Sequence, residues 1–180
     1  QSMIYKYRAT IPSSKVFVRE YEVNAEMNLF EFNNFLNVDL GFAPDQMVMF
    51  TGFDESGKMG GRYALFDLGD GPMEKVTFAD LVGKGEVIVE FCYDIRLGSV
   101  IVLTFEGEVE PQRRAQYPRM VAEKGKNPDQ FSGKYEDAVD VLQLGAKPSV
   151  PIPEDDDDFD DDDESDSDTE EIYDADESDE

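Results

Sequence analysis

The last 27 residues limit what this chain can fold into. From Glu154 to Glu180 the sequence carries 19 of the chain's 42 acidic residues and no lysine or arginine. So much charge with so few apolar groups cannot offset the entropy lost when a chain becomes ordered, so we predict a disordered acidic tail. The Pro-rich stretch 147–153 is typical of an extended linker. The sequence therefore predicts one folded domain over residues 3–146.

The body of the chain has the charge and size of an ordinary soluble domain. Residues 1–153 carry 16 basic and 23 acidic groups, whereas the whole chain has a net charge of −26. The single cysteine, Cys92, excludes an internal disulfide, which is typical of the reducing cytoplasm. No apolar run approaches the ~20 residues of a membrane-spanning helix, so we expect a cytoplasmic protein without a membrane contact.

Alternating apolar and polar residues predict strands at the start of the domain. Residues 3–11 alternate, and residues 15–23 do so again after a Pro-Ser-Ser turn, which predicts an antiparallel hairpin. A helix should follow, because Asn28 and Glu31 have the spacing of a capping box and the next apolar residues recur on one helical face. Gly41 is the expected end of that helix.

The rest of the domain predicts further strands and short helices. We expect strands at 46–53, 62–66, 86–93 and 100–105, and helices at 78–82, 117–124 and 134–144. Residues 100–105 are apolar on both faces, which places that strand in the centre of the sheet. In the strand expected at 86–93, Cys92 lies on the face opposite to Val89 and Phe91, and we expect it to be a small core residue. The order indicates an α+β, roll-like fold: a mostly antiparallel sheet of about six strands, one main helix packed on it, and C-terminal helices.

One motif imitates a nucleotide-binding loop. Residues 52–59, GFDESGKM, have the G-x-x-x-x-G-K spacing of a phosphate-binding loop. Met59 stands where that motif has the Ser or Thr that binds magnesium, and the residues after it indicate a turn and a strand in place of the required helix. We therefore interpret the segment as the loop of a β-hairpin.

The absence of histidine removes the usual general base and the commonest metal ligand. Ser-His-Asp and Cys-His catalytic machinery is excluded, and so is a zinc site built from Cys and His. Paired carboxylates could still act as acid and base, although no spacing singles out a pair. We predict a protein that is not an enzyme and that has no cofactor. The alternative is an enzyme that uses body carboxylates or the Lys58 loop.

The net-positive part of the chain lies directly before the acidic tail. Residues 111–150 hold seven basic and five acidic groups, whereas residues 1–110 hold nine and 18. Either this is an ordinary solvated surface, or the tail folds back onto it or competes there with an anionic partner. The candidate tail-docking residues are Arg113, Arg114, Arg119, Lys124, Lys126 and Lys134. Direct nucleic-acid binding is not expected, because the rest of the molecule would repel a polyanion.

Three stretches of the sequence share the order and spacing of one known family. Residues 4–36 read IYKYRATIPSSKVFVREYEVNAEMNLFEFNNFL: a strand, a short turn, a strand with aromatic residues and arginine, and the start of a helix. Residues 91–100, FCYDIRLGSV, contain Tyr93 and Asp94. Residues 116–135, QYPRMVAEKGKNPDQFSGKY, contain Tyr-Pro, Gly-x-x-Pro and Gly-x-Tyr in order. This pattern resembles the Ri-plasmid ORF-three-like family, small proteins of bacterial plasmids and insertion elements.

The resemblance covers about residues 3–144 and implies an α+β, roll-like fold in a bacterial protein. It implies no activity, because the family has no established one. Tyr93 and Asp94 are the remnant of any site at these positions, since Phe42 replaces a usual Trp and both family histidines are missing. The motif FDLGD, residues 66–70, imitates another family motif but precedes the short helix.

These observations favour a non-enzymatic interaction module of unknown role, which binds a protein partner through its body while the acidic tail tunes the electrostatics. In the alternative, the tail itself is the effector, a polyanion that engages basic proteins or mimics nucleic acid. Its large apolar residues would then be the anchors: Phe159, Ile172 and Tyr173.

Overall fold

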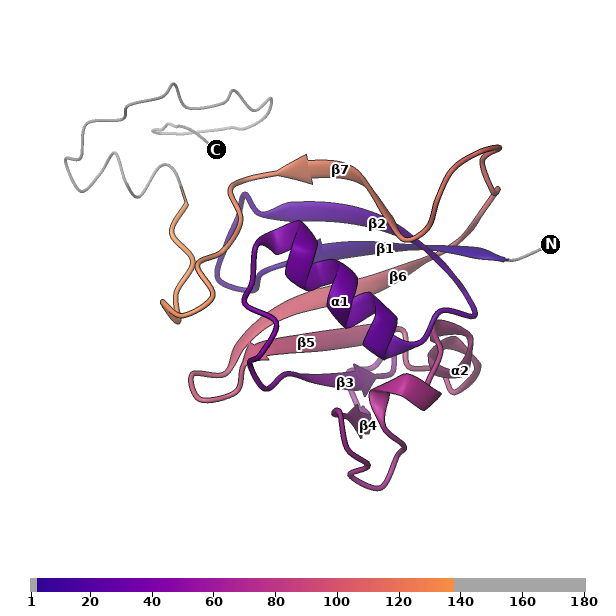
Figure 1. Cartoon of the computed structure of the whole chain (residues 1–180), viewed down its shortest axis with the longest axis horizontal. Helices are drawn as coiled ribbons and strands as arrows, with labels where there is room; N and C mark the ends of the chain where they lie inside the picture. Colours follow the sequence, from indigo (N-terminus) through magenta and orange to yellow (C-terminus); the bar gives the residue numbers. More distant parts are fainter. Residues whose placement is uncertain (1–2, 138–180) are drawn as a thin grey trace. The chain divides into compact units, whose positions relative to one another are not determined.

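A seven-stranded sheet forms the framework of residues 3–137, the part of the chain that the computed structural model describes (Figure 1). Its strands are β1 (Ile4–Thr10), β2 (Val18–Asn24), β3 (Met49–Phe53), β4 (Met59–Tyr63), β5 (Ile88–Asp94), β6 (Ser99–Val109) and β7 (Arg119–Lys124). Their order is β4-β3-β5-β6-β1-β2-β7, and every neighbouring pair is antiparallel. The predicted α+β class and the central position of β6 are confirmed, with one strand more than expected.

One main helix crosses a face of this sheet (Figure 1). The helices are α1 (Leu29–Leu40), η1 (Met73–Lys75) and α2 (Phe78–Gly83). The predicted capping box of α1 is present: Asn28 Oδ1 accepts from the Glu31 amide at 2.8 Å, and Glu31 Oε1 accepts from the Asn28 amide at 3.2 Å. The helix ends at Gly41, as predicted.

The core lies between α1 and the sheet. Successive side chains of a strand point to opposite faces, so alternate residues of each strand face the helix. Tyr7 of β1 and Phe91 of β5 are fully buried there. The Phe78 ring lies 5.1 Å from the rings of both Tyr7 and Phe32, so aromatic packing joins the sheet to both α helices.

The face away from α1 is polar at β1 and β2 and partly apolar nearer β5. Arg8 and Glu20 form a 3.7 Å ion pair across β1 and β2. Cys92, expected in the core, instead lies half-buried on this face, between its strand neighbours Met49 and Val100. The prediction was wrong because a position between two core-facing residues must point to the opposite face. Burial raises the pKa of the Cys92 thiol, so the thiol stays protonated at neutral pH.

The segment with phosphate-loop spacing is the β3–β4 hairpin, as interpreted from the sequence. Asp54 Oδ1 closes its turn by accepting hydrogen bonds from the amides of Ser56 and Lys58, each at 2.9 Å. Strand β4 begins at Met59, three residues before the predicted strand at 62–66. It ends earlier as well, because the Ala64 carbonyl turns away to accept from the Met73 amide at 2.8 Å.

The helix predicted at 117–124 is wrong, since most of that segment forms strand β7. Strand β7 pairs with β2, and Arg119 reaches Glu22 of that strand with a 2.9 Å hydrogen bond. An available sheet edge outweighed the weak helical spacing of so short a segment. In the helix predicted at 134–144, residues 134–137 are not helical, and the others lie outside the described residues.

Candidate functional site at the strap end of the sheet

Residues 125–137, which we call the strap, follow β7 and run past one end of the sheet (Figure 1). Hydrogen bonds fix the strap to loops that are distant in the sequence. Ser14, in the β1–β2 turn, donates to Asp137 Oδ1 at 2.7 Å. The Ala43 amide, after α1, donates to Gln130 Oε1 at 2.7 Å. The strap therefore closes this end of the core and brings these loops into one surface.

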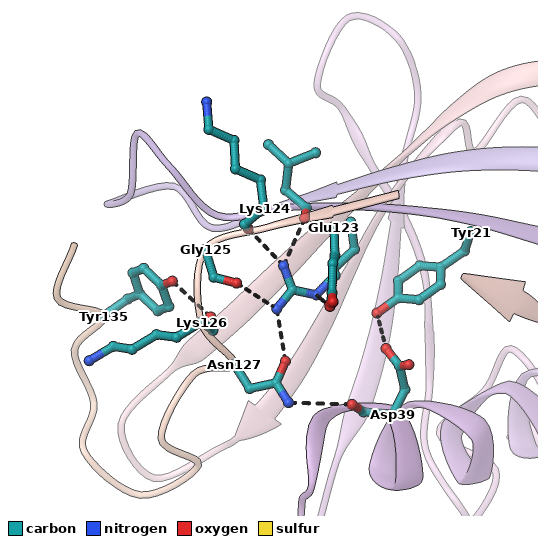
Figure 2. Close-up of polar contacts among 10 residues, drawn as sticks. Tyr21, Asp39, Glu123, Lys124, Gly125, Lys126, Asn127 and Tyr135 are labelled. Carbon is teal, nitrogen blue, oxygen red and sulfur yellow. Dashed lines mark hydrogen bonds and ion pairs between the residues drawn. The ribbon is translucent and has the colours of Figure 1, made fainter. Parts of the chain in front are cut away.

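A buried arginine holds the start of the strap. Arg19 is 1% exposed, and its guanidinium carbon lies 4.4 Å from the centre of the Phe17 ring. Its guanidinium donates hydrogen bonds of 2.7–2.9 Å to oxygens of Val18, Lys124, Gly125 and Asn127 (Figure 2). Such a planar group suits several fixed acceptors, so Arg19 serves to anchor the strap.

Arg19 was not among the residues predicted from the sequence, although a signal was present. Strand β2 and the residue before it place Phe17, Arg19, Tyr21 and Val23 on the core-facing side. A cation within a run of core positions must find acceptors or stay out of the core. This pattern alone could have marked Arg19 as a buried anchor.

Under the strap lies a cavity of about 180 Å³ with both polar and apolar lining groups, which we call the Tyr93 hollow. Its lining residues are Ile11, Pro12, Ser13, Tyr93, Leu97, Gly98, Ser99, Val100, Gly133, Lys134 and Tyr135. Tyr93 packs on Phe42, with ring centres 4.8 Å apart. Burial raises the pKa of the Tyr93 hydroxyl, and this effect outweighs the lowering by the nearby Ser99 hydroxyl. Tyr93 therefore offers a neutral ring and hydroxyl at physiological pH.

A second cavity, of about 280 Å³, adjoins the first and is called the lysine hollow here. Its lining residues are Lys126, Asp129, Ser132, Lys134, Tyr135 and Glu136. Lys134 and Tyr135 belong to both cavities, so they form the wall between them. The two lysines face two carboxylates, so the lysine hollow is polar without being strongly positive.

Tyr93 and Asp94, the two residues carried over from the family resemblance, have different roles. Tyr93 lines the hollow that is named after it. Asp94 shapes the β5–β6 turn: its Oδ1 accepts from the Leu97 amide at 3.3 Å, and its carbonyl accepts from the Gly98 amide at 2.8 Å. The Arg96 guanidinium lies 3.7 Å from Asp94 Oδ2. Both side chains are largely buried, and of the two Tyr93 is the one that lines this hollow.

The structure brings together only part of the predicted basic segment. Lys126 and Lys134 meet at the lysine hollow. Arg113 and Arg114 are exposed in the β6–β7 loop, at the end of β7 opposite to the strap. Strand β7 spans roughly 20 Å, so these two arginines are separated from the lysine hollow. The remaining two lie on β7, where Arg119 pairs with Glu22 at 2.8 Å and Lys124 ends the strand. The proposed tail anchors Phe159, Ile172 and Tyr173, and the linker 147–153, lie outside the described residues.

A buried carboxylate on the opposite side of the molecule was also missed. Glu86 Oε1 accepts a 2.7 Å hydrogen bond from the Tyr63 hydroxyl, and Oε2 accepts from the Gly61 amide at 3.1 Å. Lys84 Nζ lies 3.8 Å from Glu86 Oε2 and donates to the Tyr63 oxygen at 2.5 Å. These contacts tie β4 to the turn before β5, which is a structural role.

Residues 3–137 contain no group of three or more His, Cys, Asp or Glu side chains arranged to hold a metal ion. Within the same range there is no helix with both the length and the apolar character that crossing a membrane requires.

Comparison with known proteins supports the fold alone. No family model matches the chain, and no curated protein matches it. A solved structure is similar: the crystal structure of a protein of unknown function, MM3350, from Methanosarcina mazei Go1. The TM-score is 0.62 and the identity 14%, and the match covers 73% of this chain and 75% of that chain. This chain therefore shares its overall fold with a protein whose role is itself undefined.

Proposed function

We propose that this protein is a non-enzymatic interaction module that binds a protein partner at the strap end while its acidic tail tunes the electrostatics of that contact. The Tyr93 hollow carries the proposal. Its volume of about 180 Å³ is below the ~300–1,000 Å³ of typical small-molecule sites, so it suits a single side chain of a partner, such as an aromatic one that packs on Tyr93. Leu97, 48% exposed, forms a lip at its edge, and Lys134 on its wall can pair with a neighbouring carboxylate.

The roles of the buried charged groups support a binding function over a catalytic one. Arg19 and Glu86 hold backbone groups in place, and Asp94 shapes a turn. Tyr93 in the hollow has a raised pKa, so it is a poor general base at neutral pH. The bacterial origin implied by the resemblance and the cytoplasmic location favoured by the lone cysteine are part of the same proposal.

An acidic peptide with one aromatic residue tests the body. The probe copies residues 154–164, EDDDDFDDDDE, and is titrated into a chain shortened to end at Val150. We expect shifts of the amide resonances around Tyr93 and Lys134. Leu97→Asp should abolish them, whereas Ile95→Asp, in the same turn but outside the hollow, should not. Binding that Leu97→Asp leaves unchanged would contradict a site in the hollow.

The role of the tail is tested by comparing amide spectra of the full chain and the chain ending at Val150, at low and high salt. Differences at Lys126 and Lys134 that fade with salt would support electrostatic tuning, because salt screens exposed charges. Superimposable body spectra would show a tail that does not act on the body. That result would favour the alternative function, in which the tail engages basic proteins through Phe159, Ile172 and Tyr173.

A further inference from the structure

The loop between β4 and η1 exposes three large apolar side chains within four residues. Leu65 is 54% exposed, Phe66 57% and Leu68 37%. Single exposed apolar residues are normal on protein surfaces, but a contiguous group marks an interaction site. These residues overlap the FDLGD motif, which has no part in the strap-end site.

The backbone of this loop is fixed even though its apolar side chains are exposed. The loop ends are joined by the 2.8 Å hydrogen bond from the Met73 amide to the Ala64 carbonyl, and both residues are buried. Inside the loop, Asp67 Oδ1 accepts from the amides of Gly69 at 2.7 Å and Gly71 at 3.0 Å. Both glycines have positive φ, 123° and 96°, which other residues rarely adopt. The loop is therefore preorganised, which lowers the entropic cost of binding.

A further contact fixes the loop against the edge of the sheet. Asp70 Oδ2 accepts from the Arg62 amide of β4 at 3.0 Å, and the neighbouring Gly61 amide is bound by Glu86. Two donors of β4 are thus already occupied by carboxylates. An added strand from another chain would not find these donors free, which favours docking through the side chains of the loop.

The charge around the loop indicates which partner it fits. Residues 54–75 contain five acidic and three basic groups, and the whole chain carries −26. The two amide hydrogen bonds lower the pKa of Asp67, so it stays ionised at neutral pH. A second copy of this chain and an anionic membrane would both be repelled.

We propose that Leu65, Phe66 and Leu68 pack against the apolar face of a helix of a basic partner protein, with positive groups beside that face lying opposite Asp67 and Asp70. Buried apolar anchors supply most of the binding energy of such contacts, and the surrounding charges set partner choice and association rate. This surface is separate from the strap-end hollows and does not depend on the function proposed for them.

The test uses the full chain, labelled for NMR, with two short amphipathic helical peptides that share one leucine stripe. One peptide carries lysine on its polar face and the other glutamate. We expect the lysine peptide to shift the amides of residues 64–73 in a saturable way, and the glutamate peptide to leave them in place. The double variant Phe66→Ser, Leu68→Ser should weaken binding at the loop roughly tenfold or more, because two apolar anchors are lost.

Matched variants exclude a general effect of surface change. Val38→Ser, at an 83% exposed apolar position on α1, should leave loop binding unchanged, and Phe66→Leu should retain most of it. The lysine peptide also contacts acidic residues elsewhere, so the readout is the loop resonances alone.

Three results would overturn the proposal: shifts from the lysine peptide that bypass the loop, equal binding of the glutamate peptide, or equal loop binding by the double variant. In a last experiment, neutral phosphatidylcholine vesicles are added to the labelled full chain in place of a peptide. Broadening of the loop resonances by these vesicles, lost in the double variant, would identify a lipid surface as the occupant in place of a protein.

Discussion

The Tyr63 hydroxyl donates a 2.7 Å hydrogen bond to Glu86 in a space that exists because residues 52 and 60 are glycines. A Cβ atom at Gly52 or Gly60 would collide with the Glu86 carboxylate. Gly52 and Gly60, in and beside the segment with phosphate-loop spacing, thus have a structural role: they leave room for the buried Glu86 side chain. Burial, together with the bond to Glu86, raises the pKa of Tyr63, so the hydroxyl remains a donor.

Replacement of Glu86 by alanine should destabilise the protein by about 1–3 kcal/mol, because the Gly61 amide and the Tyr63 hydroxyl lose their acceptor in a buried place. Urea unfolding followed by circular dichroism measures this change. Glu55→Ala, at an exposed position, is the control and should change the free energy of unfolding by less than about 0.5 kcal/mol. Equal effects of the two variants would show that the buried contacts contribute little.

Gly60→Ala should destabilise the protein through its collision with Glu86, and this effect should be partly relieved in the Glu86→Ala background. A double-mutant cycle of unfolding free energies measures the coupling. Gly83→Ala is the matched control: its Cβ meets open space at the end of α2, so it should stabilise the protein by about 0.5–1 kcal/mol. Additive effects of Gly60→Ala and Glu86→Ala would contradict the shared space.

Arg19→Lys should destabilise the protein by about 1–3 kcal/mol, because an ammonium group cannot reproduce the planar donors that reach Lys124, Gly125 and Asn127. Hydrogen exchange of the strap amides should accelerate more than that of β5. Arg8→Lys, in an exposed ion pair with Glu20, should change stability by less than about 1 kcal/mol. Unchanged exchange in the strap of Arg19→Lys would show that Arg19 does not anchor it.

Two buried tyrosines should respond oppositely to loss of their hydroxyls. The Tyr7 hydroxyl is buried without a hydrogen-bond partner among the described residues, so Tyr7→Phe should be neutral or stabilising. The Tyr21 hydroxyl donates to Asp39 at 2.8 Å (Figure 2), so Tyr21→Phe should cost about 0.5–1.5 kcal/mol. Thermal unfolding compares the two variants. A larger loss for Tyr7→Phe than for Tyr21→Phe would contradict these assignments.

Tyr7 should also contribute to the loss of stability at alkaline pH. Burial raises the pKa of Tyr7 above the value of about 10 that tyrosine has in an unfolded chain. Above pH ~10 the unfolded chain therefore binds fewer protons than the folded one, so stability falls as the pH rises. Tyr7→Phe should make this fall shallower in urea titrations between pH ~9 and ~11. An identical slope for the variant would show that Tyr7 does not titrate differently in the two states.

Local patterns in the sequence were sufficient for several elements. The alternation along β1 predicts a half-buried strand, because side chains of a strand point to opposite faces in turn. The capping pair Asn28 and Glu31 predicts the start of α1, since both partners lie within one turn of helix. The glycines of residues 52–59, together with the turn and strand pattern after them, predict a hairpin loop. In each case the atoms that decide the structure are close together in the chain.

Tertiary structure decided the rest, because the deciding partners are far apart in the sequence. Residues 119–124 became a strand because the edge of β2 was available to pair with them. Arg19 is buried because the end of β7 and the strap, more than 100 residues later, supply acceptors. Glu86 is buried because two distant glycines leave room for it. Tyr93 lines a hollow only because the strap lies beside it. Periodicity shows which face of an element is buried, but only the folded chain determines which groups meet there.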